Sequence, residues 1–164
     1  VVAIADDGSL SEPSAEVSHR TPSAFSVWMK RYGAAGAGDA DADADGLANA
    51  VEYLTGGDPS RAGDSRSGGL GCTVEAIAPG LLPSLVFRYR RATAATTDPG
   101  LSHALELSED GLRGWTPAAA MAGSTETTSS DPDQAGTERV EVRVPLGTRH
   151  RSLFGRLRVT LANP

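Results

Sequence analysis

One stretch of twelve residues, from Asp41 to Glu52, constrains this chain more than any other part of its sequence. It reads DADADGLANAVE, so carboxylates stand at positions 1, 3 and 5, a glycine at position 6 and a glutamate at position 12. This is the calcium-loop pattern D-x-[DN]-x-[DN]-G-x5-E. Alternating aspartates alone would also suit a solvated linker of Asp-Ala repeats, but a linker does not require the glycine and the glutamate at these offsets. The sequence therefore predicts a loop that folds around a cation.

The spacing gives each ligand of the predicted site a role. The oxygen donors would be Asp41, Asp43, Asp45, Leu47, Asn49 and Glu52. The aspartates offer carboxylates, Leu47 its backbone carbonyl, Asn49 a direct or water-mediated contact, and Glu52 two oxygens. Ca2+ accepts six to eight oxygens in flexible geometry, whereas Mg2+ prefers an octahedron and keeps its waters. Because four carboxylates this close repel one another, the loop is expected to be loose without an ion.

A helix is predicted before the loop. Thr21 and Pro22 are typical of a helix start, with Thr21 as the N-cap. Apolar residues then recur at i, i+3, i+4 and i+7, and Gly33 is a natural C-terminal cap. These apolar residues are Phe25, Trp28, Met29 and Tyr32. An aromatic stripe of this kind is far more often core packing than a ligand platform.

A second helix is predicted over about 47–55, with Leu47, Val51 and Leu54 on one face, before Gly56 and Gly57 end it. The order is helix, loop, helix, as in an EF-hand. A glycine-rich gap over 33–40 separates the first helix from the loop, and the loop occurs once. Both features favour a static clamp over a calcium-triggered switch.

From residue 72 the hydrophobic period changes to two, which indicates half-buried strands. The inward positions would be Val74, Ala76, Ala78, Leu85, Phe87, Tyr89, His103, Leu105, Leu107, Val140, Val142, Val144, Leu157, Val159 and Leu161. Residues 122–137 are expected to be a long Thr/Ser-rich loop. Five or six strands without helices between them predict an antiparallel β-sandwich, immunoglobulin- or fibronectin-like, so the fold class is mainly β with a small α part.

Four segments follow from these patterns. Residues 1–20 are an N-terminal strand (Val1–Ala5) and arm, 21–59 the helix-loop-helix, 60–71 a linker and 72–164 the β-sandwich. Hydrophobic residues make up 39% of the chain and aromatic residues 5%, which allows only a thin core. Such a core benefits from a metal that staples it.

Residues 42–59 resemble the "DGDGLSNLLEYALGLDP" type of motif found near the C-termini of large secreted proteins of the Verrucomicrobia and Planctomycetes. Further blocks are similar to the same module: the helix from Phe25 to Gly33, residues 85–91, residues 104–115 with their similarity to "YTVEVSTDLxxW", and the closing strand 154–161. The resemblance covers residues 22–162 and implies an extracellular, calcium-bound β domain with no assigned activity. The loop also resembles those of EF-hands, thrombospondin type 3 repeats and dockerins, although the last two need tandem copies.

Composition excludes several classes of partner. The formal charge of −6 argues against nucleic acid and against an anionic membrane surface. No apolar run approaches 18 residues, so no transmembrane helix is expected. Val1 starts a short apolar run without a basic flank, so no signal peptide is expected, and a secreted chain would be the processed form. We expect a secreted or cell-surface protein. Cys72 is the single cysteine, expected to be a small buried hydrophobe, with intermolecular pairing as the alternative.

No catalytic constellation is evident, so we expect a protein that is not an enzyme. His19, His103 and His150 form no zinc-spaced cluster with Cys72, and no serine has a G-x-S-x-G setting. His103 is in phase with the inward side of a strand and is expected to be packed or hydrogen-bonded. Arginines recur along the predicted strands, as solvated faces and edge protection or as a surface for an acidic partner subunit.

Two functions fit these features. One is a calcium-stabilised structural module of the cell exterior that assembles into fibres when Val1–Ala5 adds a strand to a neighbouring copy. Its alternative is that residues 1–20 are disordered or pair within their own chain. The other function is a carbohydrate- or surface-binding adhesion module, with Trp115 or Tyr89 as its platform, although both aromatics are also expected in the core. The sequence leaves the partner and the oligomeric state open.

Overall fold

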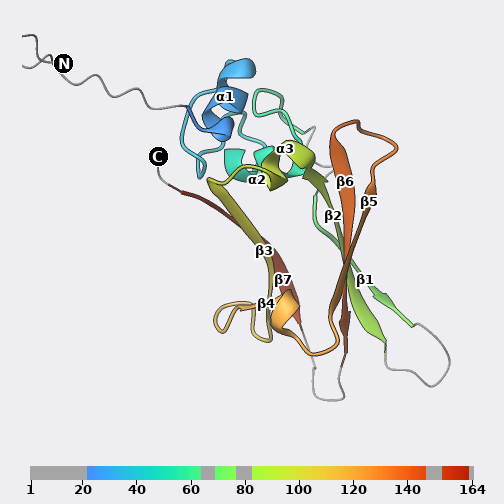
Figure 1. The fold of residues 1–164 in the computed structure, drawn as a ribbon. Coiled ribbons are helices and arrows are strands. Elements are labelled where there is room, and N and C mark those ends of the chain that lie inside the picture. The colour runs from blue at the N-terminus through green and yellow to red at the C-terminus, as the bar shows by residue number, and fades with distance from the viewer. Residues whose placement is uncertain (1–21, 64–68, 77–82, 147–152, 163–164) are drawn as a thin grey trace, which may run out of the picture.

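The computed structural model describes residues 22–63, 69–76, 83–146 and 153–162. Among them the main elements run in the order α1, α2, β1, β2, α3, β3, β4, η2, β5, β6 and β7. A mainly β fold with two antiparallel sheets and a small α part is therefore confirmed (Figure 1). The strand predicted at Val1–Ala5, the arm after it, His19 and His150 lie outside the described residues.

Helix α1 (Ala24–Arg31) begins later than predicted. Its N-cap is Ser23, whose Oγ accepts the Ser26 N–H at 3.2 Å, so the assignment of Thr21 as the cap was wrong. The sequence could not separate the two because both residue types satisfy the orphan N–H groups of a first turn. Gly33, at φ 65°, ends the helix as predicted. None of the described helices is long and apolar enough to cross a membrane.

Helix α2 (Asn49–Thr55) begins two residues after its predicted start and ends at Gly56, which adopts φ 78°. Leu54 is fully buried, as expected for the apolar face. The buried side of α2 also carries polar residues, since Asn49 and Glu52 are both 0% exposed. Burial of polar groups is costly unless partners compensate it, so apolar packing alone does not explain the positions of Asn49 and Glu52.

The first sheet has the strand order β1 (Gly71–Glu75), β2 (Ser84–Ala92), β6 (Thr137–Pro145) and β5 (Thr125–Ser130). The second has the order β4 (Thr116–Pro117), β3 (Leu101–Ser108) and β7 (Phe154–Leu161). All pairs are antiparallel. Figure 1 shows the sheets as two layers, with the helices gathered at one end.

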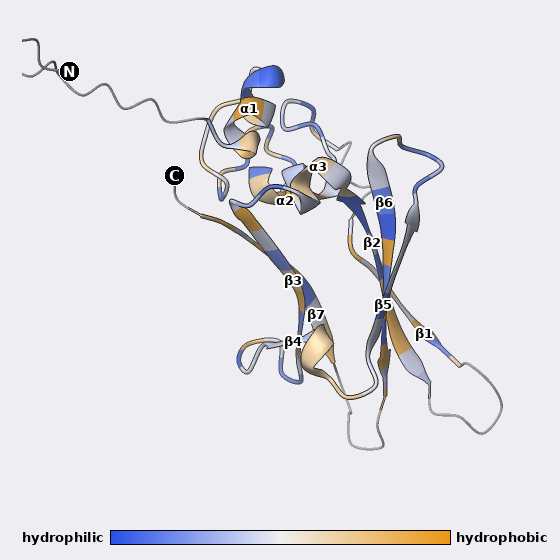
Figure 2. Ribbon diagram, in the orientation of Figure 1, coloured by the Kyte–Doolittle hydropathy of each residue, from blue (hydrophilic) through white to orange (hydrophobic). Residues whose placement is uncertain are grey.

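The main core lies between the two sheets. Its buried residues are Leu85, Phe87, Tyr89, Leu105, Leu107, Ala118, Val140, Val142 and Val144. Eight of these nine are positions that the two-residue period assigned to the inside, the exception being Ala118 of the 3-10 turn η2 (Ala118–Ala120). Figure 2 shows hydrophobic positions of β6 alternating with hydrophilic ones, whereas β2 is hydrophobic in its first half and hydrophilic in its second. The predicted inward positions of β2 and β6 are buried, as are Leu105 and Leu107 of β3, whereas Val74 of β1 is 64% exposed and Val86, predicted to face outward on β2, is fully buried.

Three sequence expectations were wrong here. The predicted loop 122–137 contains β5, whose side chains are all exposed, so the strand has no apolar alternation to announce it. A one-turn helix, α3 (Thr93–Thr96), separates β2 from β3, although no helix was expected between strands. Cys72 is exposed on β1 rather than buried. The first predicted strand also ends at Glu75, and residues 77–82 lie outside the described part of the chain.

The helices share their core with the sandwich. Tyr53 and Leu54 of α2 and Ala95 of α3 form a second buried cluster, against which Leu157 of β7 packs, and Leu157 also packs on the main core. The aromatic rings of Phe25 and Tyr53 meet edge to face with centroids 5.5 Å apart. Leu157 therefore links the two clusters, and the helical part forms a cap on one end of the sandwich (Figure 1). We call residues 22–57 the helical cap.

Candidate metal centre

Residues 41–47 wind into a compact loop held by their own carboxylates. Asp41 accepts the N–H groups of Asp45 at 3.2 Å and Gly46 at 2.9 Å, and Asp45 accepts that of Leu47 at 2.9 Å. Ala44 adopts φ 61° and Gly46 φ 96°, so the chain turns sharply at loop positions 4 and 6. These turns point the three aspartates into one space.

The carboxylates of Asp41, Asp43 and Asp45 converge, with one oxygen of each within 4.8 Å of the others. Calcium binds its ligands at about 2.4 Å, so two ligands of one ion lie no more than about 5 Å apart. Among the described residues this is the one group of His, Cys, Asp and Glu side chains close enough to hold a metal. The structure thus brings together three of the six predicted ligands.

Asp43 is the most constrained of the three. Its Oδ1 accepts the Asp45 N–H at 3.2 Å, whereas its Oδ2 is buried with no hydrogen-bond partner. Desolvation, together with the neighbouring carboxylates of Asp45 and Asp41, raises the pKa of Asp43. A buried carboxylate oxygen facing like charges is costly unless a cation or a proton offsets it. The donor set and this oxygen therefore fit a hard divalent cation.

Asn49, the predicted ligand at loop position 9, is hydrogen-bonded to the backbone. It is fully buried, its Oδ1 accepts the Ala42 N–H at 3.1 Å, and its Nδ2 donates to the Ala37 carbonyl at 2.9 Å. The Asn49 N–H also donates to the Ala40 carbonyl at 2.7 Å. One side chain thus ties the glycine-rich gap to the start of the loop. Its amide oxygen is engaged with the backbone, so it braces the site.

The remaining two predicted ligands belong to the loop's exit. Leu47 is half-buried at loop position 7, and Glu52 is fully buried on α2. Glu52 is not part of the converging carboxylate group. A Cβ placed on Gly57 would lie 3.2 Å from Cβ and 3.3 Å from Oε1 of Glu52, so the Gly57 backbone packs closely against this side chain. Its spacing in the loop pattern had marked Glu52 as a ligand. Fully buried acidic residues are rare unless their charge is compensated.

The loop and the residues next to it contact other parts of the chain at several points. Gly38 packs so closely on Leu161 of β7 that a Cβ there would collide with the leucine, and Gly63 donates its N–H to Asp45 at 3.1 Å. The Tyr53 hydroxyl donates to the buried carboxylate of Asp98 at 3.1 Å. Burial and this hydrogen bond raise the pKa of Tyr53 to about 12. Residues on either side of the loop therefore contact β7 and the connection between β2 and β3.

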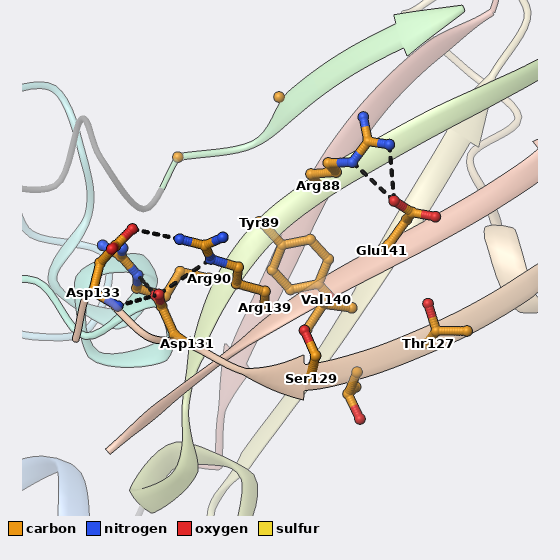
Figure 3. A pocket seen from close by; sticks show the side chains of 13 residues that line it. Arg88, Tyr89, Arg90, Thr127, Ser129, Asp131, Asp133, Arg139, Val140 and Glu141 are labelled. Atoms are coloured by element: carbon orange, nitrogen blue, oxygen red, sulfur yellow. Dashed lines mark hydrogen bonds and ion pairs between the residues drawn. The ribbon is translucent and has the colours of Figure 1, made fainter. Parts of the chain in front are cut away.

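A polar hollow lies on the outer face of the first sheet (Figure 3). It measures about 810 Å³ and is lined by β2, β5 and β6. Its arginines are paired with acids: Arg88 with Glu75 at 2.6 Å and Glu141 at 2.8 Å, and both Arg90 and Arg139 with Asp131. Arg88 and Arg139 are exposed, as expected for a solvated face, whereas the side chain of Arg90 is only 12% exposed and pairs with a buried carboxylate. Because these arginines are paired with acids, the hollow has little net charge with which to attract an ionic ligand.

The remaining candidate residues from the sequence are His103, Tyr89 and Trp115. His103 is half-buried, with its Nε2 3.1 Å from the Arg91 guanidinium, and burial together with Arg91 lowers its pKa. Tyr89 is buried in the main core, as expected. Trp115 is half-buried with the Arg156 guanidinium 4.1 Å above its ring, and it belongs to neither core cluster. Tyr89 therefore offers no ring face for stacking a sugar, and the prediction of a core position was wrong for Trp115, one face of which is covered by Arg156.

Comparison of the chain with protein-family models, with curated proteins and with solved structures finds no match.

Proposed function

We propose that residues 41–52 bind Ca2+ and that the protein is a non-catalytic structural module whose helical cap is locked by the ion. The observation that carries this is the buried Oδ2 of Asp43, set among three converging carboxylates without a hydrogen-bond donor. An ion there would receive oxygens from Asp41, Asp43 and Asp45, with Leu47 and Glu52 completing the shell as the spacing predicts. Asn49 supports the loop from behind.

The ion would act on folding. Converging carboxylates repel one another, and a cation converts that repulsion into attraction. Since the loop leads directly into α2, and Tyr53 and Leu54 of α2 pack on the sandwich, ion binding would stabilise the whole cap. This supports a site of action in calcium-rich surroundings, outside the cell. The EF-hand-like and immunoglobulin-like readings of the two parts belong to this proposal, supported by the loop's internal hydrogen bonds and by two sheets of four and three strands.

Calorimetric titration and thermal unfolding test the calcium site together. Wild-type protein is expected to bind one Ca2+ and to unfold at a higher temperature with Ca2+ than with a chelator. Asp41→Ala should abolish both effects, whereas Asp43→Asn should weaken them, because the pattern accepts asparagine at position 3. Asp133→Ala is the matched control, an exposed aspartate outside the loop. Absence of binding at millimolar Ca2+ would refute the proposal.

The module is further proposed to assemble with copies of itself through the strand predicted at Val1–Ala5. Two sheets with open edges support this, because an unpaired edge is a template for another strand. Deleting residues 1–10 should abolish assembly and leave calcium binding intact. Fibres that form unchanged from the truncated protein would remove this part of the proposal.

Carbohydrate binding is the second candidate function, and the outer-face hollow is the observation that favours it. Hydroxyl groups of Thr127 and Ser129 line it beside charged groups of Arg88 and Glu141, a donor and acceptor mixture that sugars can use. Binding on a glycan array that is lost in Thr127→Ala but kept in Trp115→Ala would place a sugar in this hollow. Loss in Trp115→Ala instead would place it at the half-buried indole.

A further inference from the structure

The first sheet has one strand more than the second among the described residues, and the strand without a counterpart is β1, at one edge of the first sheet. A Cβ on Gly155 of β7 would meet the ring of Phe87, so β7 faces β2. β1 lies one strand beyond β2 in the first sheet. The matching place beside β7 in the second sheet holds no strand among the described residues.

Apolar side chains on both sides of this place are uncovered. Cys72 and Val74 pair with Phe87 and Leu85, so they share the inward face of the first sheet. Yet Cys72 is exposed and Val74 is 64% exposed. Their phase in the sequence is that of core residues, and they lack an opposing strand. This explains why the prediction of a buried cysteine was wrong.

The edge of β7 offers a row of backbone groups for pairing. Ala162 donates its N–H to the Gly100 carbonyl at 2.7 Å, which directs the backbone groups of residue 162 toward β3. Since these groups alternate along an antiparallel strand, those of Gly155, Leu157, Val159 and Leu161 point to the open edge. Leu157, Val159 and Leu161 are only half-buried there.

A hollow of about 400 Å³ adjoins the far end of this edge. Its lining includes Val159 and Leu161 of β7, Ala50 and Val51 of α2, and Asp39 of the glycine-rich gap. Small and branched apolar side chains dominate it. An extended apolar segment laid along β7 would reach this hollow at one end and, at the Gly155 end, would approach the exposed inward side chains of β1 across the sandwich.

From these observations we infer that the Val1–Ala5 segment of a second copy adds to the open edge of β7 as an eighth strand, antiparallel to it. This inference rests on the proposed assembly through residues 1–5 and assigns its acceptor. The sequence VVAIA suits the place, since its β-branched residues favour strands and alternate side chains can face Val74.

Charge sets the direction of the added strand. Asp6 and Asp7 follow Ala5. An antiparallel strand carries them toward Arg156, which with Arg158 shares the single carboxylate of Glu106. A parallel strand would carry them toward Asp39 and the calcium loop, where like charges repel.

The direction in turn favours a neighbouring copy over the same chain. In the antiparallel arrangement the chain after Ala5 leaves at the Phe154 end of β7. The described chain begins just before α1, which lies at the opposite, helical-cap end (Figure 1). An arm of the same chain would have to run back along the whole sandwich, whereas a copy placed beyond the Phe154 end receives it directly. Repetition of this contact gives an open head-to-tail filament.

The test compares Val74→Asp with Val27→Asp in the full chain with Ca2+, by light scattering and negative-stain microscopy. Both valines are exposed, at 64% and 57%, but Val27 lies on α1, away from the open edge. Wild type and Val27→Asp should form filaments and Val74→Asp should stay monomeric. Val159→Pro should also block assembly because it removes an edge N–H, whereas Val159→Ala, which keeps that N–H, should assemble. Circular dichroism confirms that each variant is folded.

Cys72 gives an independent readout because it is the only thiol. Alkylation should label it in truncated monomers and fail to label it in filaments. Filaments formed by Val74→Asp and Val159→Pro with a reactive Cys72 would overturn the assignment of β7, even if deletion of residues 1–10 still abolished assembly. A wild-type monomer whose Cys72 becomes reactive only after that deletion would also overturn it, by showing that the segment pairs within its own chain.

Discussion

Substituting Gly155 by alanine measures how closely the two sheets approach each other. A Cβ at this position would stand 2.8 Å from Cζ of Phe87 and 3.2 Å from its Cδ1. Carbon atoms prefer about 3.5–4.0 Å, so either the ring leaves its rotamer or β7 moves outward by about 1 Å. Phe87 is 1% exposed and has no solvent to turn into.

The expected cost follows from these contacts. Overpacking of a core site costs about 1–3 kcal/mol, and the loss of glycine's freedom in the unfolded chain returns about 0.4–1 kcal/mol. Gly155→Ala should therefore destabilise the protein by about 1–2 kcal/mol, which lowers the melting temperature by about 2–8 °C for a chain of this size. Circular dichroism melts with saturating Ca2+ measure this.

Gly71→Ala is the matched control. This glycine also lies in a strand, but its Cβ would meet nothing nearer than the Arg88 carbonyl at 3.7 Å, an ordinary contact. Its stability should be unchanged or slightly raised. In a Phe87→Leu background the penalty of Gly155→Ala should largely disappear, because the two sites are coupled. Equal stability of the two alanine variants would refute the apposition of β2 and β7, and with it the empty place opposite β1.

Three further predictions concern the loop, the sheet and the cap. Gly46→Ala should weaken calcium binding and lower stability by about 1 kcal/mol, because φ 96° is strained for alanine while no atom obstructs its Cβ; titration calorimetry and melts check this. Burial opposes ionisation of Asp131, but the Asp133 N–H and the Arg90 and Arg139 guanidiniums outweigh it and lower the pKa to about 2. The stabilisation is therefore present above the ordinary pKa of 3.8 and lost as pH falls toward 2, so melts of Asp131→Asn should differ from wild type at about pH 5 and converge near pH 2. Tyr53→Phe should cost about 1 kcal/mol in denaturant unfolding at neutral pH, and the difference should vanish as pH rises from 10 toward 12, where the wild-type phenol would ionise.

Much of the fold follows from periodicity. Positions such as Phe87 and Val142 are inward in the two-residue pattern and form the core. β5 escapes this reasoning because its strand is held by backbone pairing with β6 and by threonine-rich composition, without burial. A pattern of burial can reveal only those strands that are buried.

The candidate site shows a similar division. Spacing identified Asp41, Asp43 and Asp45 as a converging group, since loop offsets are local. The bracing role of Asn49 depends on the carbonyl of Ala37, twelve residues earlier, and on the path of the gap between them. No local pattern encodes that path. Cys72 likewise has an inward phase but is exposed, because no strand among the described residues lies beside β7 to face β1.

Leu157 belongs to the surroundings of both buried clusters, and that sharing sets how local opening spreads through the molecule. When the cap loosens, the side chain loses partners on one side, and β3 and β7 lose part of their support, whereas β5 at the opposite margin of the other sheet does not. Amide hydrogen exchange should therefore accelerate along β3 and β7 on chelation and stay unchanged in β5. Ion binding would thus stabilise the sheet that contains β3 and β7 more than the sheet that contains β5.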